Sequence, residues 1–164
     1  MFDMKRTHVA ILVLVVLVAA VGSVAATAGG TVLVVADAET GEEYLTTPVQ
    51  NGSTVGLEYN HSVEKTRVYD GYTVRGDRLV NTRMEFESYG WGLPSRVNVT
   101  RENGTFIYDP PGSYERFTVA PGRIAGHELH VDGRSYDLVA LSDGESVTLS
   151  IRHRSSLATV LDRL

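Results

Sequence analysis

The sequence predicts an all-β fold, an antiparallel sandwich or barrel, preceded by one N-terminal transmembrane or signal helix. Past residue 30, short runs of β-branched and aromatic residues alternate with turn dipeptides such as Asn51-Gly52, Gly76-Asp77 and Asn103-Gly104. These residues tolerate the positive φ angles that tight hairpins require. A helical period is almost absent from the same region. Short strands separated by regular turns are typical of sandwiches and barrels.

The N-terminal segment, residues 1–28, is predicted to be a membrane anchor or a signal segment. Lys5 and Arg6 precede a long apolar run, and no Asp, Glu, Lys or Arg follows until Asp37. A helix over residues 9–28 would be about 30 Å long, enough to cross the hydrocarbon core of a bilayer. The basic residues before it predict a cytoplasmic N-terminus and an external C-terminal domain. The alternative is a secreted protein, because Ala26-Thr27-Ala28 fits the cleavage site of a signal peptide.

Residues 30–153 are predicted to form one exported β-domain, since no linker or repeat divides them. The runs that we interpret as strands are Thr31–Ala36, Glu43–Val49, Thr54–Val63, Arg67–Val74, Arg78–Ser88, Arg96–Arg101, Thr105–Tyr108, Arg116–Val119, His127–Val131, Ser135–Leu141 and Ser146–His153. Between the seventh and eighth of these, Asp109-Pro110-Pro111-Gly112 is expected to be an irregular loop. Residues 154–164 form a short C-terminal tail, in which a serine at 155 or 156 can cap a short helix.

The composition excludes several classes of protein. The chain has no cysteine, so a disulfide framework and a lipid-modified cysteine are both excluded. The 20 acidic residues exceed the 15 basic ones, and lysine occurs only at Lys5 and Lys65, a pattern typical of proteins that stay soluble in high salt. No basic face is present, which argues against a nucleic-acid partner. Four asparagines lie in Asn-x-Ser/Thr triplets and are candidates for glycosylation in an exported chain: Asn51, Asn60, Asn98 and Asn103.

Strand alternation places three of the five histidines on inward faces. Along residues 55–63 the odd positions are apolar or aromatic, so His61 is expected to face the core, whereas Asn60, Ser62 and Glu64 face outward. By the same phase His127 and His153 point inward. These three histidines are therefore candidate metal ligands, although nothing in their spacing requires a metal. The simpler interpretation is buried imidazoles that hydrogen-bond to the protein.

A hydrolase is the least favoured interpretation of the polar residues. It would use Ser62 as nucleophile, a histidine as base and Glu64 or Glu85 to orient that base. Ser62 and His61 are strand neighbours and should point apart. Ser62 also lacks the Gly-x-Ser-x-Gly elbow of typical serine hydrolases.

The segment Tyr89-Gly90-Trp91-Gly92-Leu93-Pro94 is expected to end a strand. Gly90 and Gly92 permit backbone angles and close approaches that other residues forbid. Pro94 fixes the exit of the loop. Trp91 is then either packed on a neighbouring sheet or exposed as part of a binding surface.

Two stretches, Glu58-Tyr59-Asn60-His61-Ser62-Val63-Glu64 and Ser88–Pro94, resemble the signature stretches of the domain of unknown function 1850 family. This resemblance implies an exported or membrane-anchored β-domain that accompanies TRAP-type transporters with a TAXI-class binding protein. No catalytic residue is implied. Trp91 departs from the pattern, which usually has a small residue there. The positions that we interpret as candidate binding residues are Tyr59, His61, Ser62, Glu64, Gly90, Trp91 and Gly92.

These observations together predict a membrane-anchored extracytoplasmic β-domain that acts as a non-enzymatic accessory to a TRAP-type transporter. Its expected partners are the membrane and the transporter subunits or their binding protein, and no cofactor is expected. A small-ligand or metal-binding exported domain is the alternative. An exported hydrolase is the third possibility.

Overall fold

The computed structural model describes residues 30–88 and 99–154, of which Thr31–Arg152 form one compact unit. This unit is all-β and built from antiparallel pairings, as the sequence predicts. The expected helix within residues 1–28, the loop with Gly90, Trp91 and Gly92, the glycosylation candidate Asn98 and the C-terminal helix lie outside the described residues.

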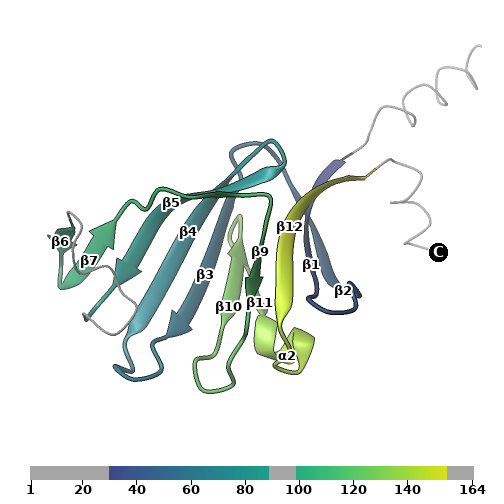
Figure 1. Cartoon of the computed structure of the whole chain (residues 1–164). Coiled ribbons are helices and arrows are strands. Elements are labelled where there is room, and N and C mark those ends of the chain that lie inside the picture. Colours follow the sequence, from purple (N-terminus) through teal and green to yellow (C-terminus); the bar gives the residue numbers. More distant parts are fainter. Residues whose placement is uncertain (1–29, 89–98, 155–164) are drawn as a thin grey trace, which may run out of the picture. The chain divides into compact units, whose positions relative to one another are not determined.

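The strands form two sheets (Figure 1). The smaller sheet has the order β2 (Glu43–Val49), β1 (Gly30–Asp37), β12 (Val147–Arg154) and β9 (Arg116–Val119). The larger sheet has the order β11 (Arg134–Asp137), β10 (Glu128–Val131), β3 (Thr54–Asn60), β4 (Arg67–Arg75), β5 (Arg78–Phe86), β7 (Thr105–Tyr108) and β6 (Thr100–Glu102), and β8 (Ser113–Tyr114) also pairs with β5.

Side chains from both sheets meet in one hydrophobic core. Its fully buried members include Leu33 from β1, Leu149 from β12, Val74 from β4 and Leu129 from β10. On β4, β10 and β12 alternate residues contribute, as expected for strands with one face on a core, whereas β1 is buried on both faces and its Val32, Val34 and Ala36 form a second buried cluster. Burying these aliphatic side chains is the main source of stability, at roughly 1.5–3 kcal/mol for each large one.

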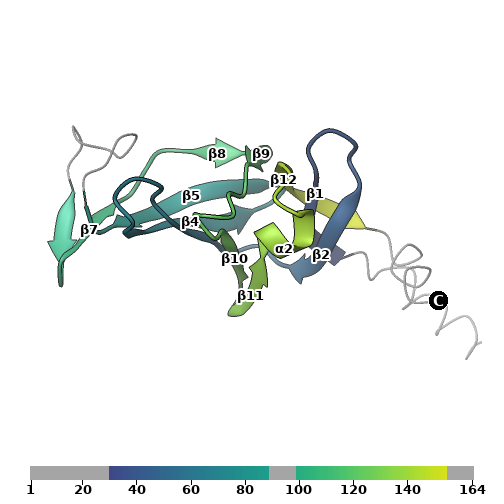
Figure 2. The same ribbon diagram turned by 90° about the horizontal axis from the view of Figure 1, so that it is seen from below.

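The segment from β8 to β9 crosses from the larger sheet to the smaller one. Tyr114 of β8 lies opposite Leu79 of β5, and three residues later Phe117 lies opposite Leu149 of β12. Figure 2 shows this segment running along β4 and β5. The rings of Phe117 and Tyr72 stack with their centroids 4.9 Å apart, so the crossing is held against β4 by aromatic contact.

Several predicted strands have different ends in the structure; β1, β4, β6 and β12 differ from their predicted ends by one residue within the described part of the chain. The strand predicted over Thr54–Val63 ends at Asn60, because the backbone turns at residues 62–64 and Lys65 adopts a positive φ of 58°. The strand predicted over Arg78–Ser88 ends at Phe86. The strand predicted over His127–Val131 begins at Glu128.

A short helix, α2 (Leu138–Ser142), replaces the end of the strand predicted over Ser135–Leu141. Asp137 caps it, because its carboxylate accepts the backbone N–H of Ala140 at 3.0 Å. Leu138 and Ser142 are its buried residues. The apolar character of residues 138–141 predicts a strand, but the capping aspartate before them favours a helix. Within residues 30–88 and 99–154, no helix has the length and apolar character needed to cross a membrane.

Candidate functional site

The first signature stretch forms the end of β3 and the turn that follows it. His61 is buried, with 9% of its surface exposed, as the strand phase predicts. Its Nδ1 accepts the backbone N–H groups of Val63 and Glu64 at 3.3 and 3.2 Å. The backbone N–H of His61 also donates to the carbonyl of Thr66 at 2.8 Å. His61 therefore acts as the cap of a tight turn, with its Nδ1 as the acceptor.

The turn and a neighbouring loop expose two large aliphatic side chains. Val63, at the turn, is 67% exposed, which corrects the expectation that it faces the core. Ile124, in the loop between β9 and β10, is 80% exposed. The two segments are joined because the backbone N–H of Asn60 donates to the carbonyl of Ala125 at 2.8 Å. The two segments, residues 62–65 and residues 122–126, lie at the lower edge of the view in Figure 1. We call them together the loop-end surface.

A partly buried polar pair, Tyr59 and Asp70, lies next to this surface. The hydroxyl of Tyr59 hydrogen-bonds to the carboxylate of Asp70, which lies opposite Leu57 and Met84 on the inward face of the larger sheet. Burial raises the pKa of Asp70 to about 6, although the hydrogen bond from Tyr59 opposes this shift. The pKa of Tyr59 rises to about 12 through burial and the adjacent carboxylate.

Tyr59 also contacts the loop between β9 and β10, which contains His127. Its ring stacks on that of His127, with centroids 4.9 Å apart and planes 14° apart. The Nδ1 atom of His127 accepts the backbone N–H of Gly122 at 3.2 Å, and burial lowers the pKa of this histidine. Tyr59 therefore connects Asp70 in the sheet to the loop that carries Ile124.

Asp70 is a residue of this site that the sequence did not predict. Along β4, Val68, Asp70, Tyr72 and Val74 share one face, and Val68 and Val74 are fully buried. An acidic residue at an inward position of an otherwise apolar strand face is the signal that could have revealed it. Among the residues that the structure describes, no basic side chain contributes to the environment of Asp70.

The structure brings the start of the second signature stretch next to the first. The hydroxyls of Thr66 and Ser88 lie 2.9 Å apart, so Ser88 sits beside the turn that His61 caps. The two remaining candidates of the first stretch, Ser62 and Glu64, are exposed on that turn. Gly90, Trp91 and Gly92 lie outside the described part of the chain.

The three histidines proposed as metal ligands do not form a metal site. Within residues 30–88 and 99–154, no three His, Cys, Asp or Glu side chains are grouped so that they could hold a metal ion. His61 is committed to the turn, and His127 to Tyr59 and Gly122. His153 is exposed rather than inward, because it lies near the end of β12, where the alternation of burial stops.

Ser62 does not have the environment of a serine nucleophile. It is exposed on the turn, while the Nδ1 lone pair of His61 is directed at the two amides of that turn. Glu85, the other carboxylate considered for an orienting role, is bound by Arg67 and Arg83 at 2.9 and 2.6 Å. His61 and Glu85 are therefore engaged in separate local structures.

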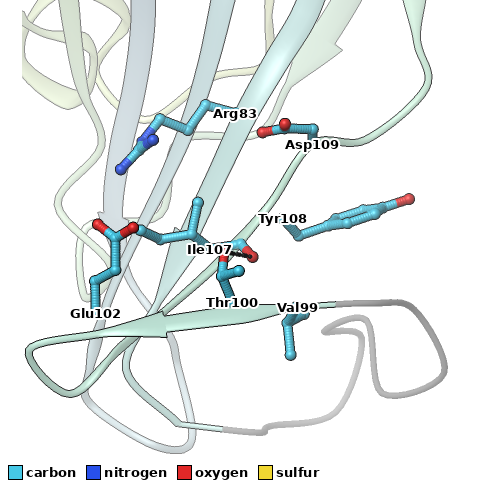
Figure 3. Close-up of a pocket in the computed structure, with 7 residues that line it drawn as sticks. All are labelled: Arg83, Val99, Thr100, Glu102, Ile107, Tyr108 and Asp109. Atoms are coloured by element: carbon cyan, nitrogen blue, oxygen red, sulfur yellow. Dashed lines mark hydrogen bonds between the residues drawn. The ribbon is translucent and has the colours of Figure 1, made fainter.

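The opposite, outer face of the larger sheet carries a row of charged side chains. Glu58, Tyr69 and Glu85 lie side by side on β3, β4 and β5. Arg67 joins the two glutamates, with 2.9 Å to each carboxylate, and its guanidinium lies 5.3 Å from the centroid of the Tyr69 ring. Glu85 also forms an ion pair with Arg83, which extends the row of charged side chains. This network ends at a cavity of about 550 Å³ beside β5, β6 and β7 (Figure 3).

Of the glycosylation candidates, Asn51, Asn60 and Asn103 are exposed. Asn51 lies in the turn between β2 and β3, where its side-chain oxygen accepts the N–H of Gly76 at 3.1 Å. Asn103 lies in the turn between β6 and β7 and adopts a positive φ of 50°. All three side chains therefore lie at turns or at a strand end.

The fold and the site define an all-β domain with a capped, exposed turn next to a partly buried tyrosine–aspartate pair. The chain belongs to the family described as Domain of unknown function (DUF1850), whose model matches residues 55–138. The matched region runs from β3 to the first residue of α2 and contains Tyr59, His61, Asp70 and Ser88. No significant match is found among curated proteins or solved structures.

Proposed function

We propose that this chain is a membrane-anchored extracytoplasmic binding domain, without enzymatic activity, that serves as an accessory to a TRAP-type solute transporter. Its partner would be a membrane subunit of the transporter or the substrate-binding protein. Support for the anchor comes from the uncharged apolar run after Lys5 and Arg6. Support for the transporter comes from the resemblance of the two signature stretches.

The observation that carries the proposal is the exposure of Val63 and Ile124 on two loops that are joined to each other. Loops held by a rigid scaffold are common sites of recognition, and an exposed apolar group on such a loop is suited to burial against a partner. His61 fixes the turn with two hydrogen bonds, so little conformational entropy is lost there on docking. The loop-end surface is therefore the contact that we propose for the transporter.

The test is affinity purification of the tagged, full-length protein from its native membranes in mild detergent, with mass spectrometry of the retained proteins. Val63→Asp and Ile124→Asp place a charge in the proposed contact. Ala140→Asp adds the same charge at an exposed position of α2 and is the matched control. We expect transporter subunits to be retained by the wild type and the control but lost from both loop variants.

Two results would contradict the proposal. One is recovery of the wild-type protein alone, in a folded state. The other is equal retention of transporter subunits by the wild type and the double variant Val63→Asp/Ile124→Asp. Thermal unfolding of each variant must accompany the purification, because a loss of binding counts only when the melting temperature is unchanged.

Binding of a small ligand is the second candidate function, and one observation favours it. Asp70 is a mostly buried carboxyl group held by the hydroxyl of Tyr59, and such perturbed acids are concentrated at functional sites. Asp70→Asn, with Tyr59→Phe as its partner variant, would abolish ligand-induced stabilisation if the cluster binds the ligand. Unchanged stabilisation of both variants would place the ligand elsewhere.

A further inference from the structure

The start of β1 and the loop-end surface lie at opposite ends of the compact unit. Thr31 of β1 pairs with Val49, the last residue of β2. A connection over residues 50–53 leads from Val49 to Thr54, the first residue of β3. β3 ends at Asn60, whose N–H donates to the carbonyl of Ala125 in the loop-end surface at 2.8 Å. The start of β3 therefore lies near the start of β1, and the end of β3 lies at the loop-end surface.

The neighbouring strands of the larger sheet have the same polarity. Thr54 of β3 lies opposite Thr73, near the end of β4, and the turn after β4 contains Gly76. The carbonyl of Thr54 accepts the N–H of Asp132, in the turn between β10 and β11, at 3.1 Å. We call the turns at residues 50–53, 76–77 and 132–133 the β1-side turns. In Figure 1, β3 runs from these turns toward the lower edge of the view, where the loop-end surface lies.

The length of β3 separates these two ends. β3 contains seven residues, and a strand rises about 3.3 Å per residue, so β3 spans roughly 20 Å. Only Gly29 lies between the predicted anchor, residues 1–28, and the first residue of β1, Gly30. One or two residues reach no more than about 7 Å. In a chain anchored through residues 1–28, this short connection would hold the β1-side turns near the bilayer and direct the loop-end surface away from it.

The loop-end surface has the chemistry of a contact with a soluble protein rather than with lipid. The charged residues beside its two exposed aliphatic side chains are balanced. Glu64 and Lys65 have opposite charges, and Arg123 pairs with Asp143 of the neighbouring turn at 2.6 Å. Segments that bind a bilayer surface usually carry an excess of basic residues. An apolar centre with a polar rim is instead the usual anatomy of a protein–protein interface.

We infer that the loop-end surface binds the soluble substrate-binding protein of the transporter and not a membrane-embedded subunit, an inference that rests on the proposed function. Val63 and Ile124 would enter an apolar depression of that protein, while Glu64 and Lys65 stay at the solvated rim. The anchored chain would hold the bound protein about 20 Å beyond the β1-side turns. A subunit embedded in the bilayer would meet the β1-side turns instead.

The first test separates the two candidate partners. Full-length protein is placed in nanodiscs of phosphatidylcholine and phosphatidylglycerol, and biolayer interferometry measures its affinity for the purified substrate-binding protein and, separately, for the purified membrane subunits. We expect only the substrate-binding protein to bind. Val63→Asp and Ile124→Asp should each weaken this binding about tenfold or more, as at the centre of an interface. Gln50→Glu adds the same charge at an exposed position of the β1-side turns and should leave the affinity unchanged.

The second test measures how far the loop-end surface lies from the bilayer, and it needs neither a partner nor a variant. The nanodiscs carry a lipid with a nitroxide label on its headgroup, because the unpaired electron broadens the NMR resonances of nearby nuclei. We expect strong broadening of the amide resonance of Gly76, in the β1-side turns. The amide resonance of Ile124, in the loop-end surface, should be broadened much less.

The outcomes separate this inference from the proposed function. Binding of the membrane subunits alone, lost in Val63→Asp, would overturn the inference and leave the accessory role intact. Binding of neither purified protein to the wild type would overturn both. An affinity for the substrate-binding protein that is unchanged in both loop variants would place the contact elsewhere and overturn the inference. Equal broadening at Ile124 and Gly76 would overturn it as well, because the loop-end surface would then lie at the bilayer.

Discussion

The hydroxyl of Tyr59 donates a hydrogen bond to the carboxylate of Asp70, and this pair connects the first signature stretch to the interior of the larger sheet. Tyr59 is one of the residues that the sequence singles out, whereas Asp70 lies on the next strand, directly across from Leu57. The same tyrosine ring stacks on His127. One side chain therefore links β3, β4 and the loop before β10.

The raised pKa of Asp70 predicts a pH dependence of stability. In the unfolded chain the carboxyl titrates near its ordinary value of 3.8, and in the folded protein near 6. Between these values the folded state binds more protons, so its stability falls as pH rises through about 4 to 6. The raised pKa of Asp70 corresponds to a loss of stability on the order of 3 kcal/mol above that window.

Replacing Asp70 tests this prediction. Asp70→Asn should match the wild type near pH 4 and become the more stable protein above pH 6, measured by urea unfolding across this range. Asp37→Asn is the control, since its pKa is lowered to about 2, chiefly by the N–H of Thr40 and the hydroxyl of Tyr44. Its contribution is lost only as pH falls below about 4. A wild-type curve that is flat from pH 4 to 6 would contradict the assignment.

The role of His61 as a turn cap predicts a loss of stability in His61→Ala. The variant removes the acceptor for the N–H groups of Val63 and Glu64 and leaves a cavity at a buried position. We expect a loss of about 1–3 kcal/mol in the free energy of unfolding, from the lost hydrogen bonds and packing. Ser62→Ala, at the exposed neighbouring position, should change it by less than about 0.5 kcal/mol. Equal effects of the two variants would exclude the capping role.

Strand alternation predicted the burial of His61 correctly but placed the end of β3 too late. The alternation of apolar and polar residues continues through Val63 in the sequence, although the backbone turns after Asn60. The turn depends on a side-chain cap from His61, and histidine is not among the residues whose local hydrogen bonding is easily read from sequence. Tertiary partners such as Asp70 and the loop before β10 are also invisible in a single strand pattern.

The run after Tyr136 shows a second limit. Leu138, Val139 and Leu141 have the apolar character of a buried strand, and short apolar runs do not distinguish strand from helix. Asp137 favours the helix over the strand here, because its carboxylate caps the N-terminus of α2. By contrast, Asp109-Pro110-Pro111-Gly112 is irregular as predicted, because the missing N–H groups of proline cannot be restored by tertiary contacts.

Two opposed glycines predict a sensitive contact on the outer face of the larger sheet. Gly56 of β3 lies directly across from Gly71 of β4, and the ring of Tyr69 covers the space that a Cβ atom at Gly56 would need. Gly56→Ala should displace this ring and cost about 1–2 kcal/mol in unfolding free energy. In Tyr69→Ala the same substitution should cost less, which a double-mutant cycle measures. Additive losses would mean that the ring and Gly56 do not interact.

The ion-pair network around Glu85 makes a prediction about its titration. Burial alone would raise the pKa of Glu85, but the hydrogen bonds and charges of Arg83 and Arg67 outweigh it and hold the pKa below its ordinary value. Arg67→Met should therefore raise the pKa of Glu85, because one of its two guanidinium partners, at 2.9 Å, is removed. Carboxyl-resonance NMR measures the pKa of Glu85 directly.

Arg83→Met removes the other partner of Glu85, at 2.6 Å, and should also raise the pKa of Glu85. The double variant Arg67→Met/Arg83→Met should raise this pKa above its value in either single variant. Arg78→Met is the matched control, because Arg78 pairs with Glu115 and Ser113 and not with Glu85. A pKa of Glu85 that is unchanged in the double variant would show that these two arginines do not set its ionisation.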